Sequence, residues 1–208
     1  SFSALAQKKP ALVVGIVVDQ MRYEYLNKYY DRYTDKGFKR LMKEGMNCTD
    51  NHYNYAPTVT AAGHASVYTG SVPAIHGIVG NDWIEVANGK KMYCVDDSTV
   101  QTIGSKSKAG IMSPKNLFTS TITDQLKMAQ NYKSKTVAVA LKDRGSILPG
   151  GHTADAAYWY DSADGYWITS SFYTKELPAW VQKFNQEGRP QKYIKQGWNT
   201  LYPIGTYT

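Results

Sequence analysis

The sequence lacks three features, each of which would have assigned it to a special class of protein. No apolar run approaches the roughly 20 residues that a helix needs to cross a bilayer, so we expect no membrane span. No long block of like charges occurs: the 24 Lys and Arg residues outnumber the 17 Asp and Glu residues, but they are scattered. Since nucleic-acid-binding proteins gather basic residues into patches, we expect no nucleic-acid partner, and the net charge of +7 could equally attract small anionic substrates. Internal repeats and low-complexity segments are also absent.

Cysteine is scarce, with only Cys48 and Cys94 in the chain. The N-terminus bears on their redox state, because Ala4-Leu5-Ala6 is a small-x-small pattern of the kind that precedes signal-peptidase cleavage. The charged and long apolar regions of a full signal are missing, so residues 1–7 are either a signal-peptide remnant or an artificial tail. We favour the remnant, which implies a periplasmic or secreted protein. Such a compartment would favour a disulfide between the two cysteines, although two buried free thiols are equally compatible with the sequence.

The rest of the sequence predicts strands that alternate with helices. Residues 11–18 form a continuous apolar run that ends at Asp19, the pattern of a buried parallel strand. Helical spacing follows over residues 21–45, with Gly45 at the end. The other expected elements are a strand at 46–55, a helix at 60–68 stopped by Gly70, a hairpin at 83–97 around Asn88-Gly89, a helix at 117–130, a strand at 135–141, an aromatic hairpin at 156–173 and a helix at 175–188. This order predicts an α/β fold with insertions.

Charged residues follow two of the predicted strands. Asp19 stands where ligands bind in open α/β sheets, beyond the carboxyl end of a strand, so its carboxylate could hold a metal or could cap the following helix. Lys142 and Arg144 follow the later strand, and in an extended chain residues two apart project from the same side. A paired Lys and Arg suit a dianionic phosphoryl group, whereas a solvated strand end with Asp143 neutralising one charge is the alternative.

Hydroxyl, amide and imidazole side chains gather around the second predicted helix. Thr58 and Thr60 stand where this helix begins, and either could simply cap its first turn. A hydroxyl at a helix N-terminus beside a metal could instead be a nucleophile toward phosphate. Asn81 could donate its side-chain amide to a substrate oxygen, or serve as a turn residue. We expect structural roles for His64, which shares a helix face with Thr60, and for His76.

Taken together, these segments resemble a known superfamily. The segments are "VVDQMR" with Asp19, "PTVTAAGHASVYTGSVPAIHGIVGN" with Thr60 and Asn81, and "LKDRG" with Lys142 and Arg144. They resemble the alkaline phosphatase superfamily, in which the type I phosphodiesterase/nucleotide pyrophosphatase branch shares the Thr-x-x-x-His…Thr-Gly…Pro…His-Gly-Ile…Gly-Asn pattern. The Lys-x-Arg pair is similar to that of PafA-type alkaline phosphatases, which favour monoesters. The resemblance covers nearly the whole chain.

Carried over by motif position, the resemblance implies a role for each candidate. Asp19 would be a zinc ligand, and Thr60 would be the nucleophile whose Oγ also binds the metal. Thr58 would have no catalytic role. Asn81, Lys142 and Arg144 would hold the non-bridging phosphoryl oxygens. Two Zn²⁺ ions would complete the site, one activating the threonine hydroxyl and one stabilising the leaving oxygen.

One part of the family pattern is missing from this chain. The remaining zinc ligands of the family come from an Asp-x-x-x-His, an Asp-His pair and a later lone His. None of the four histidines here follows an Asp at those spacings. The chain therefore resembles the N-terminal portion of a longer enzyme, and we expect these residues alone to bind zinc poorly and to be inactive.

The resemblance implies an alkaline-phosphatase-like α/β core with a mixed, mainly parallel sheet flanked by helices and interrupted by β-rich insertions. The core would span residues 8–82 and 118–148, with one insertion at 83–117 and an aromatic-rich insertion or cap at 149–208. The parent enzyme would hydrolyse small phosphate monoesters through a phosphothreonine intermediate. The alternatives are a phosphodiesterase or nucleotide pyrophosphatase, and a fragment without catalytic activity.

Overall fold

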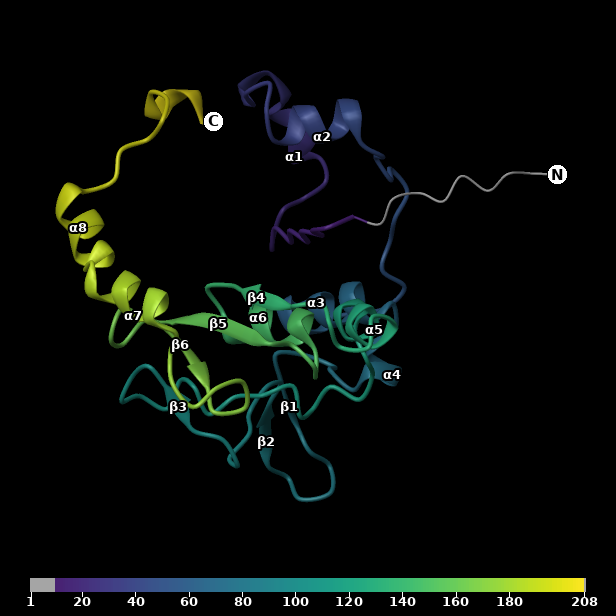
Figure 1. The fold of residues 1–208 in the computed structure, drawn as a ribbon. Helices are drawn as coiled ribbons and strands as arrows, with labels where there is room; N and C mark the ends of the chain where they lie inside the picture. The colour runs from purple at the N-terminus through teal and green to yellow at the C-terminus, as the bar shows by residue number, and fades with distance from the viewer. Residues whose placement is uncertain (1–9, 208) are drawn as a thin grey trace. The chain divides into compact units, whose positions relative to one another are not determined.

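The structure is a computed structural model that describes residues 10–207 (Figure 1). The chain divides into two compact units: the first ends at His52 and the second begins at Tyr53. The small-x-small pattern at residues 4–6 lies outside the described residues. Among residues 10–207, no helix is both long and apolar enough to cross a bilayer.

The first unit contains short helices in place of the single long helix expected at residues 21–45. They are α1 (Tyr25–Lys28), a 3-10 helix (Tyr30–Arg32) and α2 (Phe38–Glu44). The interruption has a local cause, because Gly37 has a φ of 65°, a conformation that no helix interior accepts. Gly45 ends α2, as expected.

The two strands expected in the first part of the chain are not formed. Residues 11–18 have no strand pairing among the described residues, and their apolar side chains are exposed, Leu12 to 78% and Ile16 to 79%. Residues 46–55 form bends and irregular chain. The reason is that a β-strand exists only through hydrogen bonds to a neighbouring strand, which an apolar run cannot supply by itself.

A four-stranded sheet in the order β3-β6-β5-β4 forms the centre of the second unit (Figure 1). The aromatic hairpin is confirmed as antiparallel β5 (Ala156–Asp161) and β6 (Tyr166–Ser170). The expected strand after residue 135 is confirmed as β4 (Val137–Val139), which pairs parallel with β5, and β3 (Thr102–Ile103) pairs antiparallel with β6. The sheet is mixed, as expected, but only one of its pairings among the described strands is parallel.

The hairpin predicted around Asn88-Gly89 is also confirmed, as a separate two-stranded sheet. Its strands are β1 (Asp82–Ile84) and β2 (Lys91–Tyr93), paired antiparallel. Gly89 has a φ of 67°, a left-handed conformation that glycine adopts without strain, and its N–H donates to the carbonyl oxygen of Glu85 at 2.8 Å within the connecting loop.

The second unit also contains helices. They are α3 (Thr60–Thr69), α4 (Pro73–His76), α5 (Ile122–Ala129), α6 (Asp143–Gly150), α7 (Ala179–Gln186) and α8 (Arg189–Gln196), followed by a 3-10 helix (Ile204–Thr206). Of these, α6 and α7 contact the central sheet. The prediction of α3 is confirmed, including its end at Gly70, where φ is 65°. The helix expected from residue 117 begins later, because Thr121 and Asp124 form a capping box at the start of α5.

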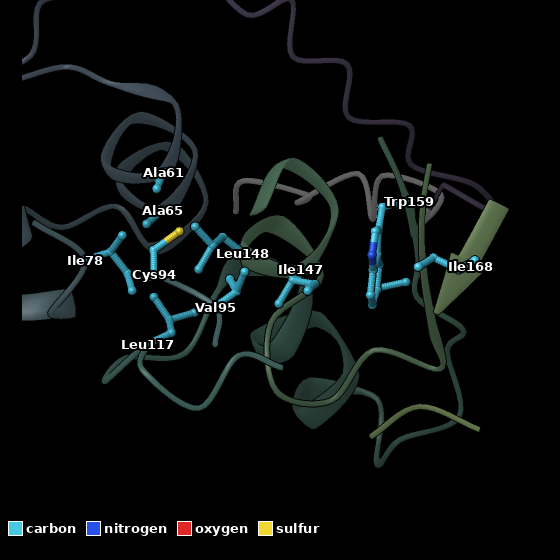
Figure 2. Packing of buried hydrophobic residues seen from close by; sticks show 11 residues of the cluster. Ala61, Ala65, Ile78, Cys94, Val95, Leu117, Ile147, Leu148, Trp159 and Ile168 are labelled. Carbon is cyan, nitrogen blue, oxygen red and sulfur yellow. The ribbon is translucent and has the colours of Figure 1, made fainter. Parts of the chain in front are cut away.

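Helix α6 is not expected from the sequence, because two glycines and Pro149 lie within its eight residues. Burial explains why it forms: Ile147 and Leu148 are fully buried in the main hydrophobic cluster. Figure 2 shows these two side chains between the Ala61 and Ala65 side of the cluster and Trp159 of the sheet. Tertiary packing therefore overrides the weak helix propensity of this segment.

The two cysteines are free thiols, so the expected disulfide is not formed in the structure. Cys94 is fully buried in the hydrophobic cluster (Figure 2), whereas Cys48 is exposed in the first unit. Burial raises the pKa of the Cys94 thiol to about 12, with a further contribution from the charge of Asp143. Cys94 is therefore a small core side chain held as a neutral thiol.

Candidate active site

The N-terminus of α3 places Thr60 at the first helical position. The preceding residue, Val59, is extended and is the N-cap of the helix, so neither Thr58 nor Thr60 occupies the N-cap position. Thr58 is exposed and lies before the helix, whereas Thr60 is half-buried in its first turn. The helix is packed through small residues, since Ala61, Ala62 and Ala65 are fully buried.

Asn81 lies against the same helix start. Its Oδ1 accepts a hydrogen bond of 3.0 Å from the backbone N–H of Ala61, the residue that follows Thr60. This bond fixes the orientation of the side-chain amide, because the oxygen must face the helix and the NH₂ group must face away from it. Asn81 is also tied to β2, since its carbonyl oxygen accepts from the N–H of Cys94 at 3.0 Å.

Arg144 lies in the first turn of α6, beside Tyr93 of β2. Its Nη1 donates to the Tyr93 hydroxyl at 2.7 Å, and that hydroxyl donates to Oδ1 of Asp143 at 2.6 Å. The same carboxylate oxygen accepts from the backbone N–H of Arg144 at 2.6 Å. The Arg144 side chain is 17% exposed, and among residues 10–207 its buried Nε has no hydrogen-bond partner. A partly buried cation that is held in one orientation is suited to an anion.

Charge around this network keeps Arg144 ionised. Burial alone would lower the pKa of the Arg144 guanidinium, but the hydrogen bond to Tyr93 and the charge of Asp143 outweigh it, so this pKa is raised. Burial and the neighbouring Asp143 raise the pKa of Tyr93 far above its ordinary value. Tyr93 therefore remains a neutral phenol that can accept from one neighbour and donate to the other.

The sequence predicts that Lys142 and Arg144 project together from an extended strand, and in the structure they do not. Strand β4 ends at Val139 and α6 begins at Asp143, so Lys142 is the exposed N-cap of a helix and Arg144 lies inside it. Two cations at a helix N-terminus face the positive end of its dipole, which is unfavourable unless an anion is present. Asp143 supplies one negative charge there, but its oxygen lies 3.9 Å from the guanidinium.

The start of α6 lies against α3. Helices α3 and α6 pack against each other, and a Cβ added to Gly145 would stand 3.8 Å from Nε2 of His64. His64 is 8% exposed and its Nδ1 donates to the carbonyl oxygen of Thr60 at 2.7 Å. A continuous path of contacts thus joins Thr60 and Asn81 through β2 to Arg144.

His76 and Ser66 resemble a catalytic dyad only in composition. Ser66 Oγ lies 2.9 Å from His76 Nε2, while His76 Nδ1 accepts from the backbone N–H of Ile78 at 3.1 Å. The proton of the neutral ring is therefore on Nε2, which donates to the serine and cannot remove its proton. Both His64 and His76 have the structural roles that the sequence predicted.

Asp19 belongs to the first unit, where it is exposed, and the other candidates belong to the second. Within residues 10–207, no group of three or more His, Cys, Asp or Glu side chains is placed to hold a metal ion. The sequence does not predict the hydrogen bond between Tyr93 and Arg144, which are 51 positions apart. The Asn-Gly turn predicts the hairpin that carries Tyr93, but nothing in the sequence indicates its partner.

A family model described as type I phosphodiesterase/nucleotide pyrophosphatase matches residues 13–206. The chain is 58% identical over 210 residues to a protein of Myroides odoratus named calcium-transporting ATPase, covering 100% of this chain and 38% of the relative. It is 56% identical over 200 residues to alkaline phosphatase PhoV of Synechococcus elongatus, and the match covers 96% of this chain and 36% of PhoV.

Alkaline phosphatase PafA of Elizabethkingia meningoseptica is 53% identical over 204 residues, covering 98% of this chain and 37% of PafA. A crystal structure of PafA matches the fold with a TM-score of 0.94, covering 98% of this chain and 39% of that one. A second crystal structure, of a PafA variant with one Thr, one Asn, one Lys and one Arg replaced, gives the same TM-score at 51% identity. The chain therefore spans less than two fifths of the length of these three relatives and shares the alkaline phosphatase fold over that part.

Proposed function

The chain belongs to the type I phosphodiesterase/nucleotide pyrophosphatase family, and on that premise we propose that it forms part of a phosphatase that hydrolyses phosphate monoesters. The observation that carries the proposal is the partly buried Arg144 side chain, a cation that Tyr93 holds through Nη1 at 2.7 Å. Hydrogen bonds through β2 connect it to Asn81 and to the helix start that carries Thr60. This arrangement suits a small dianionic group.

We assign the phosphoryl oxygens to Asn81, Lys142 and Arg144. The amide NH₂ of Asn81 faces away from α3, Arg144 offers a planar set of donors, and Lys142 adds a point charge at the start of α6. The PafA variant whose structure matches this fold has substitutions at the same four residue types as Thr60 and these three, and its Lys and Arg are likewise separated by one residue. That correspondence supports the assignment.

We assign Thr60 as the nucleophile. Its Oγ would form a bond to phosphorus while the bond from phosphorus to the leaving oxygen breaks, with the hydroxyl proton passing to solvent and the leaving alkoxide taking up a proton. Water would then attack the phosphothreonine, releasing phosphate and restoring the hydroxyl. The first-turn position of Thr60 supports this role, because the free N–H groups of a helix N-terminus stabilise negative charge.

Zn²⁺ is proposed as the cofactor of the full-length protein, with Asp19 and Thr60 as ligands. The donor set of the described residues does not complete such a site: it offers one carboxylate and one hydroxyl, in different units, whereas catalytic zinc uses three protein ligands. No step above is therefore assigned to the metal. Two ions would be needed in the complete enzyme, one for the nucleophile and one for the leaving group.

Two other activities of the same site are kept as alternatives. Cleavage of diesters or of nucleotide pyrophosphate bonds is favoured by the description of the matching family. Hydrolysis of ATP is favoured by the name of the Myroides odoratus relative. A further alternative is that these residues are a fragment without activity of their own. We also propose a periplasmic or secreted location, for which the pattern Ala4-Leu5-Ala6 is the support.

The test is a comparison of substrates and variants in the full-length protein. A chromogenic monoester, the corresponding diester and ATP are assayed under identical conditions, and the monoester should have the highest kcat/KM. Thr60→Ala should abolish turnover, whereas Thr58→Ala, a matched change two residues earlier, should leave it unchanged. Trapping the phosphoenzyme and mapping it by mass spectrometry should place phosphate on Thr60. Phosphate on Thr58 or on a serine, or a preference for the diester, would contradict the proposal.

A further inference from the structure

Tyr93 is the largest polar group beside the candidate site that the proposed function leaves without a role. It lies at the end of β2, partly buried, and its hydroxyl forms hydrogen bonds to two residues of α6. We infer that Tyr93 is a positioning residue that holds the Arg144 guanidinium in its substrate-binding orientation, with Asp143 fixing the direction of the tyrosine hydroxyl. This inference rests on the proposed function of Arg144.

The direction of each hydrogen bond follows from the chemistry of the three groups. The ionised carboxylate of Asp143 can only accept, so the Tyr93 O–H points toward it over 2.6 Å. The guanidinium can only donate, so the lone pairs of the Tyr93 oxygen receive Nη1 of Arg144 over 2.7 Å. The hydroxyl has one proton and uses it on Asp143, and therefore it is an acceptor toward Arg144.

Asp143 strengthens this interaction without binding the guanidinium directly. Its oxygen lies 3.9 Å from Nη1, beyond hydrogen-bond distance, but it accepts the tyrosine proton and so increases the negative charge on the tyrosine oxygen. The same oxygen accepts from the backbone N–H of Arg144 at 2.6 Å, which fixes the carboxylate relative to α6. Tyr93 thus bridges a carboxylate and a cation that belong to adjacent residues.

One further contact restricts the guanidinium. Its Cζ lies 5.9 Å from the centre of the Tyr93 ring, within the range of a cation–π interaction. Tyr93 is itself fixed, because the adjacent Cys94 is fully buried and donates its N–H to the carbonyl oxygen of Asn81. The guanidinium is therefore held through Nη1 in one orientation relative to β2 and the start of α6.

The test is a double-mutant cycle in the full-length protein with a phosphate monoester. Tyr93→Phe removes the hydroxyl and keeps the ring, and a lost hydrogen bond to a charged group corresponds to a fall in kcat/KM of about 10- to 100-fold. In the Arg144→Ala background the same change should alter kcat/KM by less than about twofold, because the residue through which it acts is gone. Tyr173→Phe is the matched control: this buried hydroxyl has no hydrogen-bond partner among the described residues, so its loss should leave kcat/KM unchanged.

A second variant keeps the inference testable if Tyr93→Phe does not fold, as judged by circular dichroism and thermal unfolding. Asp143→Asn retains an oxygen acceptor and removes the charge, so it should lower kcat/KM several-fold alone and have no effect without Arg144. An equal loss from Tyr93→Phe in both backgrounds would overturn the inference and leave the proposed function standing, as would wild-type activity of Tyr93→Phe. Wild-type activity of Arg144→Ala would instead overturn the assignment of Arg144, and the inference with it.

Discussion

Asn81 gives the sharpest prediction, because its two side-chain atoms serve different purposes. Oδ1 accepts from the N–H of Ala61 at 3.0 Å, in the first turn of α3, while the NH₂ group is assigned to the substrate. Asn81→Asp keeps an oxygen that can accept from the Ala61 N–H, but it replaces the NH₂ donor assigned to the substrate with a charged acceptor. Asn81→Ala removes both. The two variants should therefore rank in opposite order for stability and for activity.

The magnitudes follow from the contact with α3. In Asn81→Ala the amide of the fully buried Ala61 loses its acceptor, which should lower the free energy of unfolding by about 1–3 kcal/mol. In Asn81→Asp the bond becomes charge-assisted at a helix N-terminus, which contributes about 0.3–1 kcal/mol of stability. A carboxylate about 4 Å from a phosphoryl oxygen is repelled by about 4 kcal/mol at an effective dielectric constant of about 20, which corresponds to roughly a thousandfold loss of kcat/KM. Asn81→Ala should lose only about 10- to 100-fold.

The assays are denaturant unfolding and monoester turnover of the full-length variants. Asn88→Asp is the matched control, because Asn88 also accepts a backbone hydrogen bond through Oδ1, from Lys90 at 2.8 Å, and is exposed in the hairpin turn. It adds the same charge to the protein and should leave kcat/KM unchanged. The reasoning is refuted if the two Asn81 variants lose equal stability, or if Asn81→Asp is as active as Asn81→Ala.

The remaining predictions concern charge, pH and thiol accessibility. Replacing Lys142 and Arg144 together with Ala should lower kcat/KM for a monoester far more than for a diester, which carries fewer charged oxygens; equal losses would show a structural pair. Burial alone would raise the pKa of Asp155, but hydrogen bonds from a buried lysine and the backbone lower it to about 2, so its contribution to stability is lost as the pH falls from about 4 to 2. Asp155→Asn should make that acid-induced loss of stability shallower, and an unchanged pH dependence would contradict the assignment. A thiol reagent should label Cys48 in the folded protein and Cys94 only after unfolding, and labelling of neither thiol under denaturing, non-reducing conditions would indicate a disulfide. Elemental analysis of the 208-residue chain should find zinc well below one equivalent, whereas stoichiometric zinc with turnover would contradict the incomplete donor set.

Elements whose cause is local could be predicted from the sequence alone. The helix from Thr60 to Gly70, the hairpin around Asn88-Gly89 and the aromatic hairpin at 156–173 each combine a periodic pattern with a turn residue that ends it. The candidate residues could be named for a similar reason, because the family motifs are short segments of sequence. Their types and order do not depend on knowing the fold.

Features that require a partner from elsewhere in the chain could not be predicted. The apolar run at 11–18 has the composition of a buried strand, yet no described strand pairs with it, and composition carries no information on the neighbour. Helix α6 is the opposite case: its glycines and Pro149 argue against a helix, and the burial of Ile147 and Leu148 forms one. Because α6 forms, Lys142 and Arg144 lie at a helix N-terminus and not along a strand.

The surroundings of the candidate site were likewise decided by tertiary structure. The sequence alone determined which residues could bind a phosphoryl group, since Arg and Lys donors and an Asn amide have that chemistry in any fold. Only packing decided that Tyr93 meets Arg144, that Asn81 turns its oxygen toward α3, and that Cys94 is enclosed. The physical reason is that a side chain's chemistry is a property of the residue, whereas its partner depends on contacts between segments that are distant along the chain.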